Sequence, residues 1–216
     1  MPASYGKKLS VSNWVHVVAQ PIPGIERTEQ SPARYARGVA HVTRGQLDRL
    51  LEQALMADDH ENLARRLEEL AEAYVSGDIS RAAVLVLAAE EWRQAGKPVR
   101  ALRCFQLAVD EGGDAGADPR AGIADTLFEL EQPDEARKVI EEIRTGGVSP
   151  ATALTVAETL AAYGEPQEAH AWATRGLGDA VPGGAEHAAL LRVRYRIRVD
   201  LGLPEDELDA LLDTSH

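Results

Sequence analysis

Arginines occupy every second position in the run from Arg192 to Arg198, separated by apolar or aromatic residues. Guanidinium groups pair closely with carboxylates, so two of them held on one face could clamp a carboxylate ligand. On a helix, Arg192 and Arg196 share one face, while Arg194 and Arg198 share another. The run is therefore a candidate site for an acidic ligand.

The same arginines have a structural alternative. They could pair with nearby acids, of which Asp200 and residues 205–207 are close in sequence, or lie over apolar surface with only their charged ends in water. The conformation is also open, because strict alternation is typical of a half-buried strand. The flanking segments, residues 186–191 and the turn at 202–204, favour a helix, which we predict.

The other residues that could do chemistry form no catalytic or metal-binding pattern. The six histidines are scattered, and none has the i, i+4 spacing or the carboxylate cluster that metal ligation on a helix needs. Acid pairs such as Asp58/Asp59 are adjacent and diverge in direction, which suits solvation better than acid–base work. No phosphate-binding loop or nucleophile elbow is present. The sequence thus predicts no enzyme, no metal and no cofactor, and Cys104 is expected to be a small buried residue of a helix.

Charge and hydropathy limit the possible partners and compartment. The net charge is −12, but residues 1–45 carry +4 and residues 46–216 carry −16. An acidic body repels phosphate backbones, so nucleic-acid binding is not expected. No apolar run approaches the roughly 20 residues of a membrane-spanning helix. We therefore expect a cytoplasmic protein without a membrane partner, and the use of Arg over Lys (19 against 4) is typical of a GC-rich bacterial genome.

A recurring turn indicates which elements position these residues. In this turn, Gly (or Glu in one case) ends a helix, and Pro opens the next helix at its first turn. The prolines are 35, 33 and 38 residues apart, an interval typical of stacked helical hairpins. The four turns are Gly96-Lys97-Pro98, Glu131-Gln132-Pro133, Gly164-Glu165-Pro166 and Gly202-Leu203-Pro204.

The chain after the first 44 residues is expected to be all-α. Ala and Leu dominate its apolar residues and only 5% of the chain is aromatic, which favours close helix–helix packing over a sheet. Periodicity and capping signals predict ten helices that pair into five hairpins. The expected helices span residues 46–57, 60–76, 80–95, 98–111, 119–131, 134–145, 150–163, 166–178, 186–202 and 205–213.

Three of these hairpins resemble the tetratricopeptide repeat, most clearly over residues 82–178. In that pattern, small residues recur where the two helices of a hairpin cross closely. The unit that fits best carries Leu85, Ala88, Ala89, Trp92, Gly96, Pro98, Ala101, Phe105 and Ala108. The resemblance implies a right-handed superhelix, a tetratricopeptide-like α-solenoid, of about five stacked antiparallel hairpins over residues 45–216. The last unit departs from the pattern, because Tyr195 stands where a small residue is expected.

The resemblance also implies a binding face. In the family, the first helix of each hairpin lines a concave groove that binds a peptide or a partner helix. On this chain that face would carry a row of carboxylates, with an arginine and an aromatic one helical turn on, and an arginine pair in the last unit. Such a row favours a basic ligand, although a solvated acidic face is an equal alternative. The implied partner-binding residues are Glu90, Arg93, Asp125, Phe128, Glu158, Arg192 and Arg196.

Residues 1–44 are expected to form an irregular, basic arm. Pro21-Ile22-Pro23-Gly24 breaks any helix, and no helical periodicity precedes Gln46. Within the arm, the apolar run at 14–18 is β-prone and is expected to dock on the helices or on another chain. The candidate docking residues are Lys7, Lys8, Trp14 and Val17.

The sequence favours a protein–protein interaction scaffold that binds a protein or peptide partner. The basic arm would fold back onto the acidic face, or dock on a partner or on a second subunit of a homo-oligomer. The alternative is a regulatory or sensory module that binds a small ligand in a pocket containing Trp92, Trp172 and Tyr163.

Overall fold

The computed structural model of the chain describes residues 40–213, apart from the side chains of residues 53–55, 57 and 213. The arm predicted over residues 1–44 therefore lies outside the described residues except for its last five. Lys7, Lys8, Trp14 and Val17, its expected docking residues, are among those outside.

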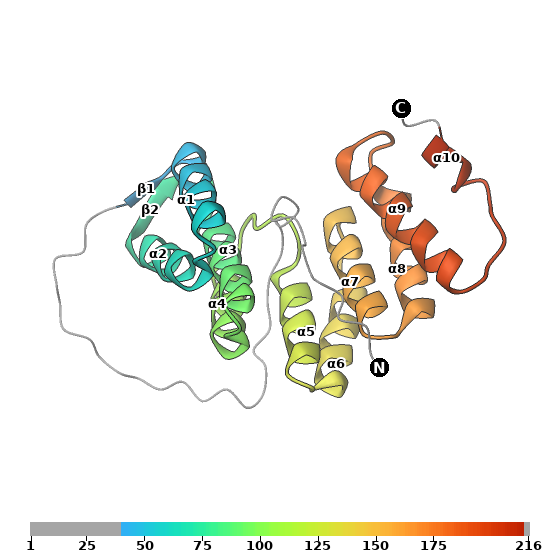
Figure 1. Cartoon of the computed structure of the whole chain (residues 1–216), viewed down its shortest axis with the longest axis horizontal. Coiled ribbons are helices and arrows are strands. Elements are labelled where there is room, and N and C mark those ends of the chain that lie inside the picture. Colours follow the sequence, from blue (N-terminus) through green and yellow to red (C-terminus); the bar gives the residue numbers. More distant parts are fainter. Residues whose placement is uncertain (1–39, 214–216) are drawn as a thin grey trace.

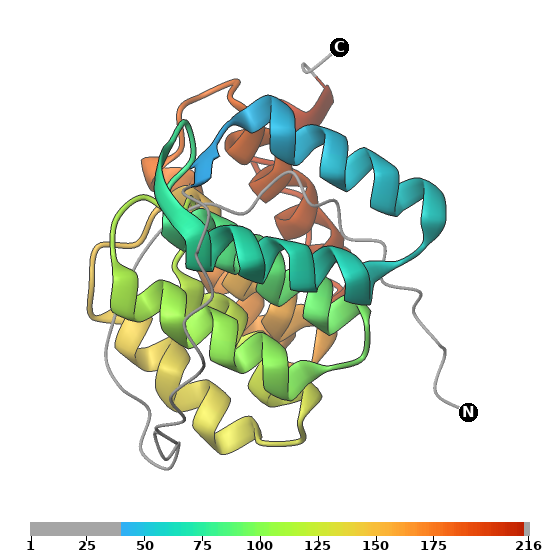
Figure 2. The same cartoon turned by 90° about the vertical axis from the view of Figure 1, so that its left-hand side faces the viewer.

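The described chain is an array of consecutive helix pairs. The helices are α1 (Arg44–Ala57), α2 (His60–Ala73), α3 (Arg81–Gln94), α4 (Pro98–Glu111), α5 (Pro119–Glu129), α6 (Pro133–Arg144), α7 (Pro150–Ala162), α8 (Pro166–Asp179), α9 (Ala185–Asp200) and α10 (Ala210–Asp213). Two short strands, β1 (Ala40–Val42) and β2 (Tyr74–Gly77), accompany them. The helix pairs follow one another along the long axis from α1 to α10 (Figure 1). Seen from the α1 end, α1 and α2 lie in front of the rest (Figure 2). The all-α hairpin array is thereby confirmed.

The turns that separate the helices have the geometry that the sequence indicates. Gly96, Gly164 and Gly202 have φ angles of 67°, 82° and 65°, in the left-handed region where glycine is least strained. Glu131 takes the same role at φ 60° in the turn that lacks a glycine. Proline occupies the first helical position of α4, α5, α6, α7 and α8, where its missing N–H removes no helical hydrogen bond.

Two expectations about secondary structure were wrong near α2. The helix expected over 60–76 ends at Ala73, and residues 74–77 form β2. β2 pairs in parallel with β1, which occupies residues 40–42 of the expected irregular arm. Gly77 permits this pairing, since a Cβ there would lie 2.1 Å from the Val42 carbonyl oxygen. The β-prone Tyr74 and Val75 thus follow a tertiary contact with a distant segment, which local periodicity does not reveal.

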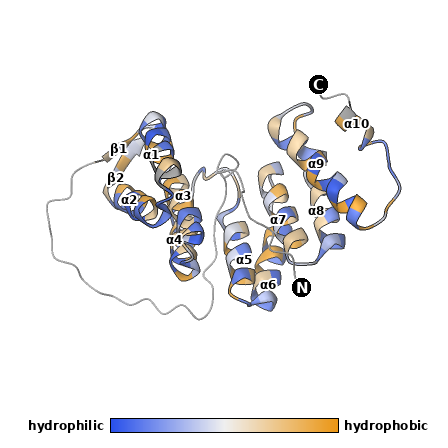
Figure 3. Cartoon of the chain, in the orientation of Figure 1, coloured by the Kyte–Doolittle hydropathy of each residue, from blue (hydrophilic) through white to orange (hydrophobic). Residues whose placement is uncertain are grey.

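The last predicted helix was also wrong in extent. Of residues 205–213, only 210–213 are helical, and residues 203–209 form a non-helical connection. The arginine-rich run, by contrast, is confirmed as a helix, because it forms the C-terminal half of α9. Strongly hydrophilic and hydrophobic residues alternate in that half of α9 (Figure 3).

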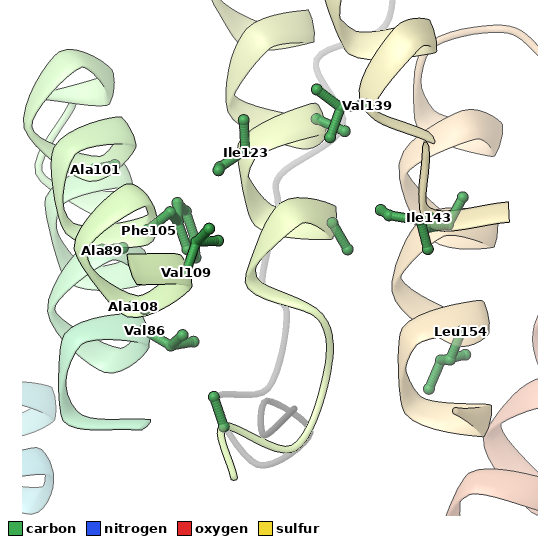
Figure 4. Packing of buried hydrophobic residues seen from close by; sticks show 14 of the residues in the cluster. Val86, Ala89, Ala101, Phe105, Ala108, Val109, Ile123, Val139, Ile143 and Leu154 are labelled. Atoms are coloured by element: carbon green, nitrogen blue, oxygen red, sulfur yellow. The ribbon is translucent and has the colours of Figure 1, made fainter. Parts of the chain in front are cut away.

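The core runs through the array as one cluster of buried residues. Trp92 of α3 and Trp172 of α8 are among its largest fully buried side chains. Phe105 and Val109 extend from α4 towards α5, which carries Ile123 (Figure 4). The ring of Phe105 packs so closely on α5 that a Cβ at position 122 would lie 2.3 Å from it. Gly122 is thus required by packing, although glycine inside a helix is otherwise unfavourable.

We expect Gly122→Ala to lower the free energy of unfolding by about 1–3 kcal/mol, because the added methyl group overpacks the contact with Phe105. Gly178→Ala, on α8, is the matched control. A Cβ there meets nothing within 4 Å, so the better helix former should raise stability by about 0.5–1 kcal/mol. Urea unfolding of both variants checks this, and equal effects of the two substitutions would contradict the close packing.

Candidate functional site

The first helices of the last four pairs, α3, α5, α7 and α9, each pack against the next. We aligned the sequences of these four helices on the turn that follows each of them. Four aligned positions in each helix make up what we call the first-helix face. These positions hold Val86, Ala89, Glu90 and Arg93 in α3, and Ala121, Ala124, Asp125 and Phe128 in α5. They hold Leu154, Ala157, Glu158 and Ala161 in α7, and Arg192, Tyr195, Arg196 and Val199 in α9.

The predicted carboxylate row lies on this face, but its first two members are buried. Glu90 is 9% exposed and Asp125 4% exposed, whereas Glu158 is half-buried. Burial follows from the stacking of hairpins, because each first helix covers part of the one before it. Only part of the row is therefore accessible to a partner.

Arg93 contacts three carboxylates, those of Glu90, Asp125 and Glu129, and we call these four residues the acidic cluster. Its Nη1 lies 2.6 Å from Oδ2 of Asp125 and 3.5 Å from Oε2 of Glu90, and its Nε donates a 3.2 Å hydrogen bond to Glu129 Oε2. Although burial opposes it, the carboxylates of Asp125 and Glu90 raise the pKa of Arg93. The sequence-based expectation placed Arg93 one turn along the binding face but did not predict that it would join α3 to α5. Glu129 was missed, although it directly follows Phe128.

Glu90 is the most perturbed carboxylate of the cluster. Its Oε1 is buried and accepts no hydrogen bond. Burial raises the pKa of Glu90 from its ordinary value near 4.5 to about 7, with Asp125 adding to the rise and Arg93 opposing it. A buried carboxyl group with one unsatisfied oxygen is held there at a cost in stability.

Glu158 carries the row from α5 towards α9. Burial raises the pKa of Glu158, Arg196 opposes the rise, and Asp125 adds to it. Among the described residues, no cation lies within ion-pair distance of its carboxylate. Beside the row, the rings of Phe128 and Tyr163 stack with centroids 4.8 Å apart and planes inclined by 13°. The face thus combines half-buried negative charge with an aromatic stack.

The two arginine pairs of α9 lie in different surroundings. Arg192 and Arg196 are exposed, and neither forms an ion pair with another described residue. Arg194 and Arg198 are buried, at 4% and 6% exposed. They occupy positions equivalent to Val156 and Leu160 of α7, which belong to the apolar core.

The buried pair is neutralised by the segment that replaces a full second helix after α9. Arg194 Nη1 donates hydrogen bonds of 3.1 Å to both Asp206 Oδ1 and Asp209 Oδ1. Arg198 contacts Asp206 through Nη1 and lies with Nε 3.1 Å from Asp209 Oδ2. The hydrogen bonds from Arg194 hold the pKa of Asp206 well below its usual range, against the effect of desolvation.

The structural alternative for the arginine run therefore applies to one of its two pairs. Pairing was expected with Asp200 and residues 205–207, and Asp206 confirms it for that range. Asp200 is exposed and takes no part. Asp209 was missed; its spacing of three residues from Asp206 is the signal that could have found it.

The remaining candidate residues, Cys104, Trp92 and Trp172, are buried in the core. Cys104 is fully buried, its Sγ lies 3.2 Å from Glu68 Oε1, and burial raises the pKa of the thiol. Trp92 and Trp172 are buried in different helix pairs, with the guanidinium of Arg100 4.4 Å from the ring centroid of Trp92. Within residues 40–213, no cluster of three or more His, Cys, Asp or Glu residues is arranged to hold a metal ion. No helix in that range has both the length and the apolar character needed to cross a membrane.

Comparison of the chain with models of known protein families finds no match, and comparison with curated proteins finds none either. The resemblance to the tetratricopeptide repeat thus remains a prediction from the residues that carry it.

Proposed function

We propose that the protein is an interaction scaffold whose first-helix face binds a basic segment of a partner protein. The observation that carries the proposal is an excess of carboxylates around one buried guanidinium. Glu90, Asp125 and Glu129 surround Arg93, and Glu158 adds a further acid on α7. In a partly desolvated site, this excess negative charge favours a cation far more than the same charge in water would.

The accessible edge of the cluster is where a partner would first make contact. The side chain of Glu129 is 32% exposed, and Glu158 is half-buried. Asp125 is buried and forms an ion pair with Arg93. A lysine or arginine of the partner would pair with Glu129 and Glu158, while its aliphatic stem covers the half-buried ring of Tyr163, which stacks on the buried ring of Phe128. In this proposal, the charged end of the partner's side chain provides specificity, and its aliphatic stem provides affinity.

The N-terminal arm is the proposed internal competitor for this face. Residues 1–39 carry five basic and two acidic residues, a charge of +3 against the acidic body. Because the arm is part of the same chain, its effective concentration at the face is high, and it would weaken the binding of a separate basic segment. A truncation that tests this should end before Ala40, since removal up to residue 44 would also delete β1.

The test measures binding of a synthetic peptide of residues 1–39 to the full chain and to a chain that begins at Ala40. Circular dichroism first establishes that the shorter chain keeps its helices. We expect the shorter chain to bind the peptide more tightly, because the competing arm is gone. Glu129→Gln with Glu158→Gln should weaken binding by about tenfold.

Glu141→Gln with Glu142→Gln is the control for net charge. Both residues are exposed on α6, so this variant removes the same charge away from the face and should bind like the parent chain. Binding that both variants reduce equally would show a non-specific effect of net charge. Binding that neither variant changes would exclude the face as the site.

A further inference from the structure

The exposed side of α9 corresponds to a side that is mostly buried in the earlier first helices, α3, α5 and α7. We call Arg192, Tyr195, Arg196 and Val199 the α9 stripe; they share one side of the helix by their i, i+3, i+4 and i+7 spacing. The equivalent residues of α7 include Leu154 and Ala157, which are 2% and 0% exposed. In α9, Tyr195 is 39% exposed and Val199 is 60% exposed.

The array itself shows what kind of element covers this side. α5 packs on α3, α7 packs on α5, and α9 packs on α7, so the cover is a helix in each case. After α9, the described residues supply no equivalent long helix. Residues 203–209 instead bring Asp206 and Asp209 to the buried pair, Arg194 and Arg198, which lies on a different side of α9. The α9 stripe is therefore a helix-packing surface without a helix on it.

The charges of the stripe specify the missing helix. Arg192 and Arg196 are exposed and lack a carboxylate within ion-pair distance among the described residues. We propose that the α9 stripe docks an acidic amphipathic helix of a partner protein, whose apolar residues cover Tyr195 and Val199 and whose carboxylates pair with the two arginines. The exposed apolar side chains are stabilised when such a helix removes them from water, and its carboxylates supply the ion pairs that the two arginines lack among the described residues.

A second copy of the chain is the other occupant to consider. If two α9 stripes packed on each other, they would bring two arginine pairs together in one interface. Like charges so placed are repulsive, and the penalty grows as the contact excludes water. The charge pattern thus favours a partner of opposite sign over self-association. The α9 stripe is the last part of the first-helix face and adjoins its acidic part, since the charge of Arg196 opposes the rise in the pKa of Glu158. It selects the opposite charge from the acidic cluster on the earlier helices.

The experiment is a selection from a library of displayed amphipathic helices against the full chain. Each library member carries one leucine stripe and has Glu, Gln or Lys at every flanking position. We expect enrichment of Glu at the positions next to the leucines. The selected helices should bind Arg192→Glu/Arg196→Glu at least tenfold more weakly, while that variant should itself select Lys at the same positions. Unchanged helicity and Tm show that the variant is folded.

Arg65→Glu with Arg66→Glu is the matched control, because both arginines are exposed on α2 and the change in net charge is the same. It should select and bind the Glu-rich helices as the parent chain does. No enrichment of Glu over Lys, or equal loss of binding in both variants, would overturn the proposal. A dimer of the parent chain in light scattering that Val199→Glu dissociates would also overturn it, since the occupant would then be a second copy.

Discussion

Replacement of Asp209 by asparagine should lower the free energy of unfolding by about 1–3 kcal/mol, because it leaves the buried guanidinium groups of Arg194 and Arg198 to share the carboxylate of Asp206. Asp209 is 9% exposed and contacts both Arg194 and Arg198 at 3.1 Å. The two guanidinium groups are themselves nearly inaccessible to water, so solvent cannot replace the lost carboxylate. Urea unfolding at neutral pH gives the measurement.

A second variant tests whether the buried charges, and not the packing of the side chains, cause the loss of stability on replacing Asp209. Arg194→Val, Arg198→Leu and Asp209→Leu together restore the apolar residue types that α7 has at Val156 and Leu160. Replacing a buried ion pair by apolar residues of similar volume is often neutral or stabilising, so this triple variant should be at least as stable as the parent chain. A loss below about 0.5 kcal/mol for Asp209→Asn alone would show that Asp209 does not form these ion pairs in solution.

The stability of the protein should fall as pH rises from about 5 to 8 because of Glu90. Burial raises the pKa of Glu90 from near 4.5 to about 7, so the folded chain holds a proton that the unfolded chain releases. Stability decreases with pH wherever the folded state binds more protons. Below pH 4.5 both states are protonated and the penalty is absent; above pH 7 the full penalty, up to about 3 kcal/mol, is present.

Glu90→Gln removes this titration and keeps the shape of the side chain. The stability of the variant relative to the parent chain should therefore increase between pH 5 and pH 8 by up to about 3 kcal/mol. Glu142→Gln removes a carboxylate from the exposed surface of α6 and should leave the pH profile of the parent chain nearly unchanged. Parallel profiles for the parent chain and Glu90→Gln would contradict the buried, protonated carboxyl group.

The recurring turn predicted the architecture because its causes are local. A residue in the left-handed region ends a helix, and a proline at the first helical position begins another, whatever the rest of the chain does. The residues of the first-helix face could be aligned for the same reason. Glu90, Asp125 and Glu158 fall at the same aligned position, and the charge of Asp125 adds to the rise in the pKa of the other two.

The surroundings of those residues could not be predicted in the same way. Neither the burial of Glu90 nor its pKa follows from residue spacing, because both depend on how closely α5 packs on α3. The ion pair between Arg93 and Asp125 joins residues of different hairpins, so it depends on how the hairpins stack. The parallel pairing of β1 with β2 likewise joins segments more than 30 residues apart.

The arginine run shows the division most clearly. Its helical spacing separates two pairs of arginines on two sides of α9, which the sequence determined by itself through the 3.6-residue period. Tertiary structure decided which pair is neutralised, because the return of residues 203–209 brings Asp206 and Asp209 to Arg194 and Arg198. Among the described residues, only the short α10 follows α9, and without an equivalent long helix Arg192 and Arg196 stay exposed. The helical period determines which residues share a side of a helix, and the tertiary structure decides which other residues that side contacts.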